Sequence, residues 1–553
     1  MRLPPRLRLS AAARRRLAAA AGGDVPADLE LAGGRVLNVY TGRLSEASVG
    51  VLDGRVAWVG EGRARETVDL DGAVVVPGLI DPHAHGDIVY TPTAFAHEAV
   101  RHGTTTAVLD AYTLAAYLDD EALTPVLDAL EAVEPKLLWG LRPARDAGGP
   151  ADEAALPLAR LQRLLQRTTV SSTGELTAWR ALLGGDARIS GFVGAATDAG
   201  LKVDGHLPGA SPRTLARLAA AGVTSDHEAI SGDELAARVE AGIWAMVRHS
   251  SLRPDAAALA REIVARSLAT DRLLLTADGV VAGDLARGHV DTVVREVIAG
   301  GVDPVTAVRM GTLNAATYLG LDAHIGAVAP GRCADLVVVD ELERFTVARV
   351  MRDGRWVEPD APLADPVDWA AMTVPIRAGA IDADALVRAC TGAPALRMNG
   401  VIARLDDDPG PHETLVALVA RDGRSITGTT TRDFDVRAVA TSVTASTDVL
   451  LLGTDPAELV RAYERVVASR GGLATPGAAV ALPAFGHLAP GPVPELARAL
   501  EHFARTAGLP DGGPPFTYRT LFLTLPALPG VCVTPDGLYD VRAQRLLTAP
   551  TAL

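Results

Sequence analysis

Two histidines spaced i, i+2, His83 and His85, follow an apolar segment at residues 74–80. On a β-strand this spacing places both imidazole rings on the same side. If the strand belongs to a parallel barrel, its carboxyl end lies on the face where such folds carry out their chemistry. Imidazole nitrogen is a preferred ligand of zinc, iron and related divalent metals. The pair therefore indicates a metal site.

Further histidines and carboxylates stand where later segments end. They are Glu175, His206, His227, Glu228 and Asp278. Four histidines plus carboxylates on successive strands are what two divalent ions bridged by a carboxylate need. Such ions lower the pKa of coordinated water from about 15.7 to about 7, so that a nucleophile is available at neutral pH.

Each of these residues also has a structural interpretation. Glu175 can begin a helix and face its dipole, and either later histidine can be a hydrogen-bonded core residue. Glu228 can orient a ligand from outside the coordination sphere, and Asp278 before Gly279 can form a turn. Four further residues are the least specific. His249 reads as a surface or supporting residue, His97 and His102 as structural residues, and Lys136 as an alternative bridging group in carboxylated form.

The elements that must position these side chains alternate between short apolar runs and longer helical patterns. Strands are expected at residues 104–109, 137–141, 189–193, 203–206, 223–226, 244–247 and 273–276. Leucines at 156, 158, 161, 164 and 165 have helical spacing. This alternation favours a parallel (β/α) barrel or a doubly wound sheet.

Both flanks of this middle region have the period-two pattern of antiparallel sheets, at residues 28–76 and 334–354. We therefore expect one β domain that the barrel interrupts. The predicted boundaries are an amino-terminal helix and the first part of a β-sandwich at 1–76, the barrel at 77–324, the second part of the sandwich at 325–375 and a third domain at 376–553. Within the third domain we expect helices near 456–469 and 494–507 and a strand at 521–525.

Composition excludes several classes of protein. The 67 acidic residues outnumber the 53 basic ones, giving a net charge of −14, whereas proteins that bind nucleic acid normally have the opposite balance. The cysteines, at 333, 390 and 532, show no paired spacing, which argues against a disulfide framework and fits a reducing cytoplasm. No segment approaches the ~20 apolar residues that span a bilayer. We expect no nucleic-acid or membrane partner.

The order of these motifs resembles the amidohydrolase superfamily, and specifically the bacterial adenine deaminase family, almost from end to end. The matching segments are residues 77–85, 174–176, 204–209, 225–228, 288–289, 310–316, 326–336 and 534–541. The resemblance implies a (β/α)8 barrel with a composite β-sandwich and a carboxyl-terminal α/β domain. It also implies His83, His85, His206 and His227 as metal ligands, Glu175 as the bridging carboxylate, and hydrolysis of adenine to hypoxanthine and ammonia.

Several segments depart from the family pattern. His-Ile-Glu-Ser-Ser is replaced at 85–89, Asp-Pro-His-Glu at 110–113, Arg-Glu-Gly-Ser at 248–251 and His-Asp-Ser-His-Asn at 445–449. Where the family has Thr-Asp-Asp, this chain has Thr276-Ala277-Asp278. The usual proton-transferring aspartate is thus Ala277, so Asp278, Glu228 or His249 must serve as catalytic acid and base.

The overall hypothesis is a cytoplasmic hydrolase acting on C–N bonds, with two divalent ions (Mn, Fe or Zn), a purine or related heterocycle as substrate, and a homo-oligomeric assembly. Two alternatives stay open. The rebuilt segments can serve another C–N bond in specialised metabolism, because a pocket built for one heterocycle leaves polar groups unpaired with another. The loss of the aspartate at 277 can also mark a catalytically silent paralogue.

Overall fold

The computed structural model describes the chain except for residues 1–2, 134–135, 145–149, 378, 380, 409–412, 510–513 and 527. It forms two compact units. The barrel unit comprises Met1–Gly86, Ala96–Val280 and Arg287–Pro366, and the carboxyl-terminal unit comprises Asp87–Phe95, Val281–Ala286 and Val367–Leu553.

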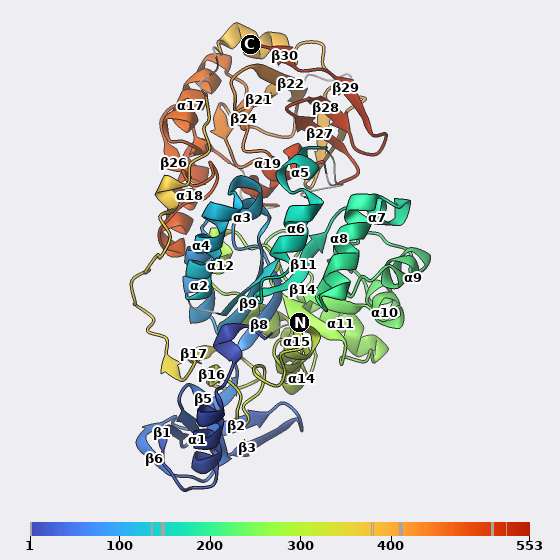
Figure 1. Cartoon of the computed structure of the whole chain (residues 1–553). Helices are drawn as coiled ribbons and strands as arrows, with labels where there is room; N and C mark the ends of the chain where they lie inside the picture. Colours follow the sequence, from blue (N-terminus) through green and yellow to red (C-terminus); the bar gives the residue numbers. More distant parts are fainter. Residues whose placement is uncertain are drawn as a thin grey trace. The chain divides into compact units, whose positions relative to one another are not determined.

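Eight parallel strands form the barrel, which confirms the expected (β/α)8 fold (Figure 1). They are β8 Leu79–Ala84, β9 Thr104–Asp110, β10 Lys136–Gly140, β11 Val170–Leu176, β12 Lys202–Gly205, β13 Ser225–Asp226, β14 Trp244–Arg248 and β15 Leu273–Thr276. Each pairs with the next along the chain, and a parallel bridge between Ala84 and Asp278 joins the first to the last. Consequently the residues that end all eight strands lie around one rim.

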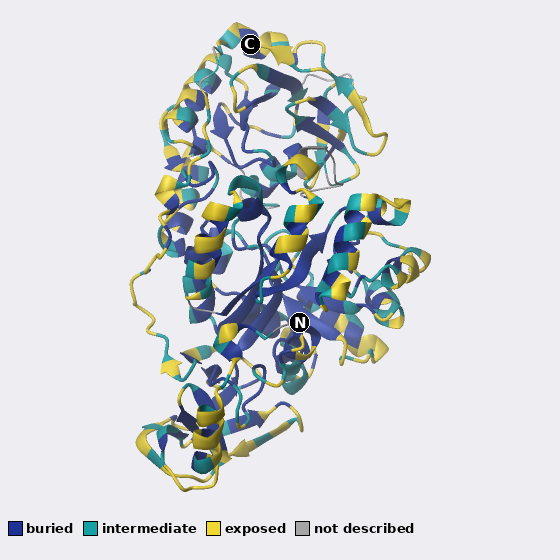
Figure 2. Cartoon of the chain, viewed as in Figure 1, coloured by how far each residue is buried: buried dark blue, intermediate teal, exposed yellow. Residues whose placement is uncertain are grey.

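Helices that follow the strands cover the barrel, with buried inner faces and exposed outer ones (Figure 2). They are α2 Pro92–Arg101, α3 Tyr112–Tyr117, α4 Asp120–Glu131, α5 Pro150–Ala155, α6 Leu158–Leu164, α7 Trp179–Gly184, α8 Ala187–Asp198, α9 Pro212–Ala220, α10 Gly232–Glu240, α11 Ala256–Arg266, α13 Val290–Ala299, α14 Pro304–Met310 and α15 Leu313–Leu319. Local sequence sets their starts. In α9, for example, Pro212 stands in the first turn and Ser211 caps the Thr214 N–H.

Two of the expected strands are wrong. Residues 189–193 lie within α8, where Asp186 caps the Ile189 N–H and the buried residues Ile189, Phe192, Val193 and Ala196 have helical spacing. Residues 521–525 fall largely within the helix α19 Phe516–Thr524. Periodicity does not separate a short buried strand from part of a buried helix, which explains both errors.

The two flanks of the barrel build a β-sandwich. One sheet contains β1 Ala27–Ala32, β4 Ser48–Leu52, β5 Arg55–Gly60 and β6 Ala64–Asp69; the other contains β2 Arg35–Asn38, β3 Arg43–Glu46, β7 Val74–Pro77, β16 Leu336–Val339, β17 Val347–Arg352 and β18 Arg355–Trp356. Strands β7 and β16 pair although about 260 residues separate them. Their apolar side chains share one core with those of the first sheet. The helices η1 Pro5–Leu7 and α1 Ala11–Ala21 precede β1.

The carboxyl-terminal unit is an α/β domain around a nine-stranded sheet. Its sheet strands are β19 Leu396–Asn399, β20 Ile402–Leu405, β21 Thr414–Val419, β22 Ser425–Thr431, β23 Val439–Thr441, β24 Val449–Gly453, β25 Gly472–Ala474, β26 Ala479–Ala481 and β30 Thr551–Ala552. Strands β27 Val531–Thr534, β28 Gly537–Asp540 and β29 Arg545–Thr548 form a smaller sheet, and the helices are α12 Ala282–Leu285, η2 Trp369–Ala371, α16 Ala383–Cys390, α17 Pro456–Ala468, α18 Val493–Ala507 and α19.

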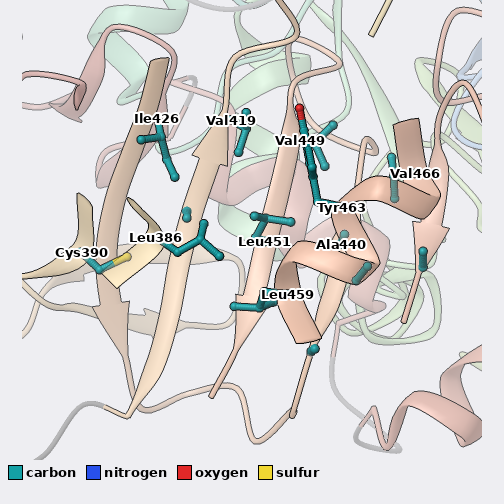
Figure 3. Packing of buried hydrophobic residues seen from close by; sticks show 14 residues of the cluster. Leu386, Cys390, Val419, Ile426, Ala440, Val449, Leu451, Leu459, Tyr463 and Val466 are labelled. Atoms are coloured by element: carbon teal, nitrogen blue, oxygen red, sulfur yellow. The ribbon is translucent and has the colours of Figure 1, made fainter. Parts of the chain in front are cut away.

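A single apolar cluster holds two of these helices against the large sheet (Figure 3). The cluster includes Leu386 of α16, Leu459 and Tyr463 of α17, and Leu451 of β24, and all four are nearly inaccessible to solvent. Helix α17 begins where Asp455 caps the Glu458 N–H. Across the described residues of both units, no helix combines the length and the apolar composition needed to cross a membrane.

Candidate metal centre

The carboxyl end of β8 presents both histidines of the His-x-His motif. The His83 side chain is 4% exposed and that of His85 is 19% exposed. The backbone N–H of His83 donates to Asp81 Oδ1 at 3.1 Å, and that of His85 donates to the Asp278 carbonyl at 3.1 Å. These hydrogen bonds fix the backbone of both residues at the junction between the first and last barrel strands.

A buried hydrogen-bond chain orients His83. Its Nδ1 lies 2.6 Å from Asp204 Oδ2, and Asp204 Oδ1 accepts from the Ser225 hydroxyl at 2.7 Å. The Tyr318 hydroxyl lies 2.7 Å from that of Ser225. His83 Nε2 is buried and has no hydrogen-bond partner among the described residues. A carboxylate on one ring nitrogen leaves the other ready to bind a metal.

Glu175 places its two carboxylate oxygens against different histidines. Oε1 lies 3.8 Å from His85 Nε2, whereas Oε2 lies 3.0 Å from His206 Nδ1 and 3.6 Å from His227 Nε2. Gly174 precedes it with a positive φ of 59°, which glycine adopts without strain and which turns the end of β11. This geometry brings the two oxygens of Glu175 to different histidines, so one carboxylate belongs to two candidate metal groups.

Donor atoms of the predicted ligands form two groups that share Glu175. One is His83, His85 and Glu175, the other is Glu175, His206 and His227, and within each group the donor atoms lie within 4.8 Å of one another. His83 and His227 also form a group with Asp204. The sequence identified the five residues, and the structure brings all five together.

The charges in this cluster shift its protonation strongly. Burial lowers the pKa of His206, but the Glu228 and Glu175 carboxylates more than offset this and raise it to about 9. Burial and the neighbouring His83 charge lower the pKa of His227 to about 4. Burial opposes ionisation of Glu175, yet nearby cations hold its pKa well below the usual value. The centre therefore contains an anionic Glu175 beside one imidazole with a raised pKa, His206, and one with a lowered pKa, His227.

Asp278 reaches the cluster although its neighbour Ala277 occupies the expected position. Its φ of +54° lies in the left-handed region, which aspartate tolerates better than most residues. Asp278 Oδ1 lies 3.2 Å from His85 Nε2 and 3.5 Å from His83 Nε2, and Oδ2 lies 3.2 Å from Arg248 Nη1. The backbone conformation at Asp278 thus directs its carboxylate toward His83 and His85.

Glu228 and His249, the other two predicted catalytic residues, lie in different surroundings. Glu228 binds Arg248 Nη1 directly. Burial raises the pKa of Glu228, but Arg248 and the histidines outweigh it and bring it to about 2. The His249 N–H donates to the Thr276 carbonyl at 3.1 Å. His249 belongs to none of the candidate metal groups found among the described residues.

Arg142 is a site residue that the sequence argument did not identify. It follows β10, and its Nη1 binds Glu175 Oε1 directly while its Nε lies 3.0 Å from Asp110 Oδ2. Its guanidinium carbon lies 5.3 Å from the centre of the Tyr112 ring. Its position in the sequence could have identified it as a site residue, because Arg142 follows the end of a barrel strand as the metal ligands do.

Lys136 does not occupy the bridging role considered as an alternative. It begins β10, at the opposite end from Arg142, and its Nζ lies 2.7 Å from Asp335 and 2.7 Å from Asp353. His97 lies away from the cluster, with its Nε2 3.0 Å from the Ala361 carbonyl, and His102 pairs with Glu98 on α2. These three residues have structural contacts.

The donor set fits divalent metal ions. Four imidazoles and a carboxylate suit zinc, manganese or iron. The buried Nε2 of His83 has no hydrogen-bond partner among the described residues, so its lone pair can bind such an ion. His206 Nδ1 and His227 Nε2 stand 3.2 Å apart. Both nitrogens lie close to the same oxygen of Glu175, so the three atoms form a group that could hold one ion.

Comparison with known proteins gives two family matches that together span most of the chain. Residues 74–357 match the model of the Amidohydrolase family, and residues 395–545 match the Adenine deaminase C-terminal domain. A protein named adenine deaminase from Nitratidesulfovibrio vulgaris is 31% identical over 94% of this chain and 96% of its own length. A putative adenine deaminase from Bacillus anthracis is 29% identical over 94% and 93%.

Solved structures resemble a smaller part of the chain. An adenosine deaminase from Xanthomonas campestris with bound zinc covers 62% of this chain and 95% of its own, with 18% identity and a TM-score of 0.45. Molinate hydrolase covers 60% and 95%, with 17% identity and a TM-score of 0.44.

Proposed function

The chain belongs to the amidohydrolase family as a divergent member of the adenine deaminases, and on this premise we propose that it hydrolyses adenine to hypoxanthine and ammonia. One observation carries the proposal: the donor atoms of His83, His85, Glu175, His206 and His227 converge on shared positions beside the Asp278 carboxylate. In the reaction, the water oxygen adds to C6 of the purine and one proton of the water passes to the amino nitrogen. The C6–N6 bond then breaks, ammonia leaves, and the second proton of the water ends on N1 of hypoxanthine.

Two divalent ions would be held in this centre. His83 and His85 would hold one, His206 and His227 the other, and Glu175 would serve both. Bound ions of this kind lower the pKa of water and polarise the carbon that is attacked. Metal identity, assembly as a homo-oligomer, a role in purine metabolism and a cytoplasmic location stay predictions.

Asp278 is the residue best placed to move protons. Burial opposes its charge, but its contacts with His83, His85 and Arg248 hold the pKa of Asp278 well below the usual value, so it begins as a carboxylate. In our proposal Oδ2 stays with Arg248 while Oδ1 accepts a proton from the attacking water. The same oxygen then delivers that proton to the departing amine.

Glu228 is better suited to positioning than to acid catalysis. It binds Arg248 directly, and its Oε1 lies 3.7 Å from His206 Nδ1 and 3.5 Å from His227 Nε2. Together with Arg248 it would fix the orientation of these two imidazoles. We assign His249 no proton-transfer step.

Ammonia release provides the test. Protein loaded with Mn²⁺, Zn²⁺ or Fe²⁺ is incubated with adenine, other aminopurines and cyclic amides, and ammonia and ring products are quantified. Turnover of adenine, abolished by His83→Ala and retained by His97→Ala, is expected. Metal-loaded protein that leaves adenine unchanged contradicts the proposal.

A second candidate, hydrolysis of another C–N bond, is favoured by one feature of the site. Asp110 and Tyr112 lie in a segment, 110–113, where the sequence departs from the family pattern, and both contact Arg142, which binds Glu175. The same panel separates the candidates: cleavage of a cyclic amide without deamination of adenine supports the second, and adenine turnover alone supports the first.

A further inference from the structure

One of the two Glu175 carboxylate oxygens already binds a positively charged side chain, that of Arg142. Arg142 Nη1 donates to Oε1, the oxygen that lies 3.8 Å from His85 Nε2. Oε2 lies against the imidazoles of His206 and His227, at 3.0 and 3.6 Å. The two oxygens therefore differ in charge environment, although a symmetric bridge would need them to be alike.

The guanidinium is built into the site. Its Nε lies 3.0 Å from Asp110 Oδ2, its plane lies near the Tyr112 ring, and only 13% of the side chain is exposed. A planar group held between two carboxylates and beside an aromatic ring has little freedom to leave. Arg142 thus remains a fixed positive charge on the His85 side of Glu175.

The consequence for a bound ion is electrostatic. A metal on His83 and His85 must share Oε1 with Arg142, and the fixed positive charge repels it at close range. Asp278, the carboxylate that faces the Nε2 atoms of both histidines, also pairs with an arginine, Arg248. Repulsion between cations at such short separations weakens binding by roughly tenfold or more even in a partly solvated site.

We infer that Arg142 makes the two metal positions unequal: the ion on His206, His227 and Glu175 binds tightly, and the ion on His83 and His85 binds about tenfold or more weakly. This inference rests on the two-ion centre of the proposed function. It predicts stepwise loading, so that at low metal concentration the protein holds one ion per chain and gains the second only at higher concentration.

Titration of the metal-free full chain with Mn²⁺, counting free Mn²⁺ by electron paramagnetic resonance, tests the inference. Wild type is expected to show two classes of site at least about tenfold apart. Arg142→Gln removes the charge and should tighten the weaker class by about the same factor, whereas Arg142→Lys keeps the charge and should leave that class weak. Arg167→Gln is the matched control, because Arg167 also pairs with two carboxylates, Asp128 and Glu131, outside the centre.

Ligand variants decide the assignment without relying on how well Arg142→Gln folds. His85→Gln should remove the weaker class, and His206→Gln the tighter one. Equal affinities in wild type, loss of the tighter class in His85→Gln, or a folded Arg142→Gln whose weaker class is unchanged would overturn the inference. If the Mn²⁺ sites are unequal but the protein deaminates no tested heterocycle, the proposed reaction is wrong and this inference stands. If the protein is an active deaminase with two equal Mn²⁺ sites, this inference is wrong and the proposed reaction stands.

Discussion

Replacing Asp278 with asparagine removes one carboxylate charge while disturbing the backbone little. Asparagine tolerates the left-handed conformation that this position requires, with φ at +54°. The amide oxygen can still face Arg248, which keeps Glu228 as its main partner. The change therefore isolates proton transfer at Oδ1, which lies 3.2 Å from His85 Nε2.

The expected loss follows from the size of general acid–base catalysis. A positioned proton-transfer group contributes about 10²- to 10⁴-fold, equivalent to roughly 3–5.5 kcal/mol of activation free energy. We expect kcat for adenine to fall by this factor in Asp278→Asn, as measured by ammonia release at saturating substrate. Metal content, measured in parallel, should stay within the wild-type range of ions per chain.

Asp53→Asn provides the matched control. Asp53 has a φ of +50° and pairs with an arginine, Arg16 Nη1 at 2.9 Å, in a turn of the β-sandwich. It should keep wild-type kcat. If Asp278→Asn binds metal normally and retains wild-type kcat, Asp278 transfers no proton in the slow step and the assignment is refuted.

Three further results are expected. Asp204→Asn should weaken Mn²⁺ binding about 10- to 100-fold, because it disturbs the carboxylate that orients His83; unchanged affinity by titration would contradict this. Glu228→Gln should lower the free energy of unfolding by about 1–3 kcal/mol, since buried Arg248 loses its main charged partner, and denaturant melts measure it. The raised pKa of His206, about 9 without metal, has two consequences. Protonation of His206 stabilises the metal-free protein below pH 6.5, and this contribution to the free energy of unfolding is lost as the pH rises through 9. Metal binding at pH 7 should displace the His206 proton, and the number of protons released should fall as the pH approaches 9. Calorimetry in two buffers measures this number.

The barrel and the ligand set could be predicted because both leave local signals. Buried parallel strands read as continuous apolar runs, and His83, His206 and His227 stand at or just after the ends of such runs. Glu175 is the exception, because its strand β11, residues 170–176, is largely polar and was not among the expected strands. Since the ends of barrel strands share one rim, order along the sequence becomes proximity in space. Residues 189–193 were wrongly expected to form a strand because the segment is too short to distinguish the period of a helix from that of a strand.

The charge pairing within the site could not be predicted. Arg142 lies 33 residues from Glu175 along the chain, and nothing in its own neighbourhood indicates which carboxylate it meets. The role of Asp278 likewise depends on one backbone angle, its positive φ. From residue types alone, Asp278 was one of three candidates to replace the aspartate missing at Ala277. Only the backbone direction shows that its carboxylate faces His83 and His85.

Diffraction at a metal absorption edge, from crystals of protein purified without chelator, tests the metal centre most directly. We expect anomalous peaks within coordination distance of the His83–His85 pair and of the His206–His227 pair, with Glu175 adjacent to both. Crystals of protein with confirmed deaminase activity whose anomalous maps are empty at these side chains would contradict the account.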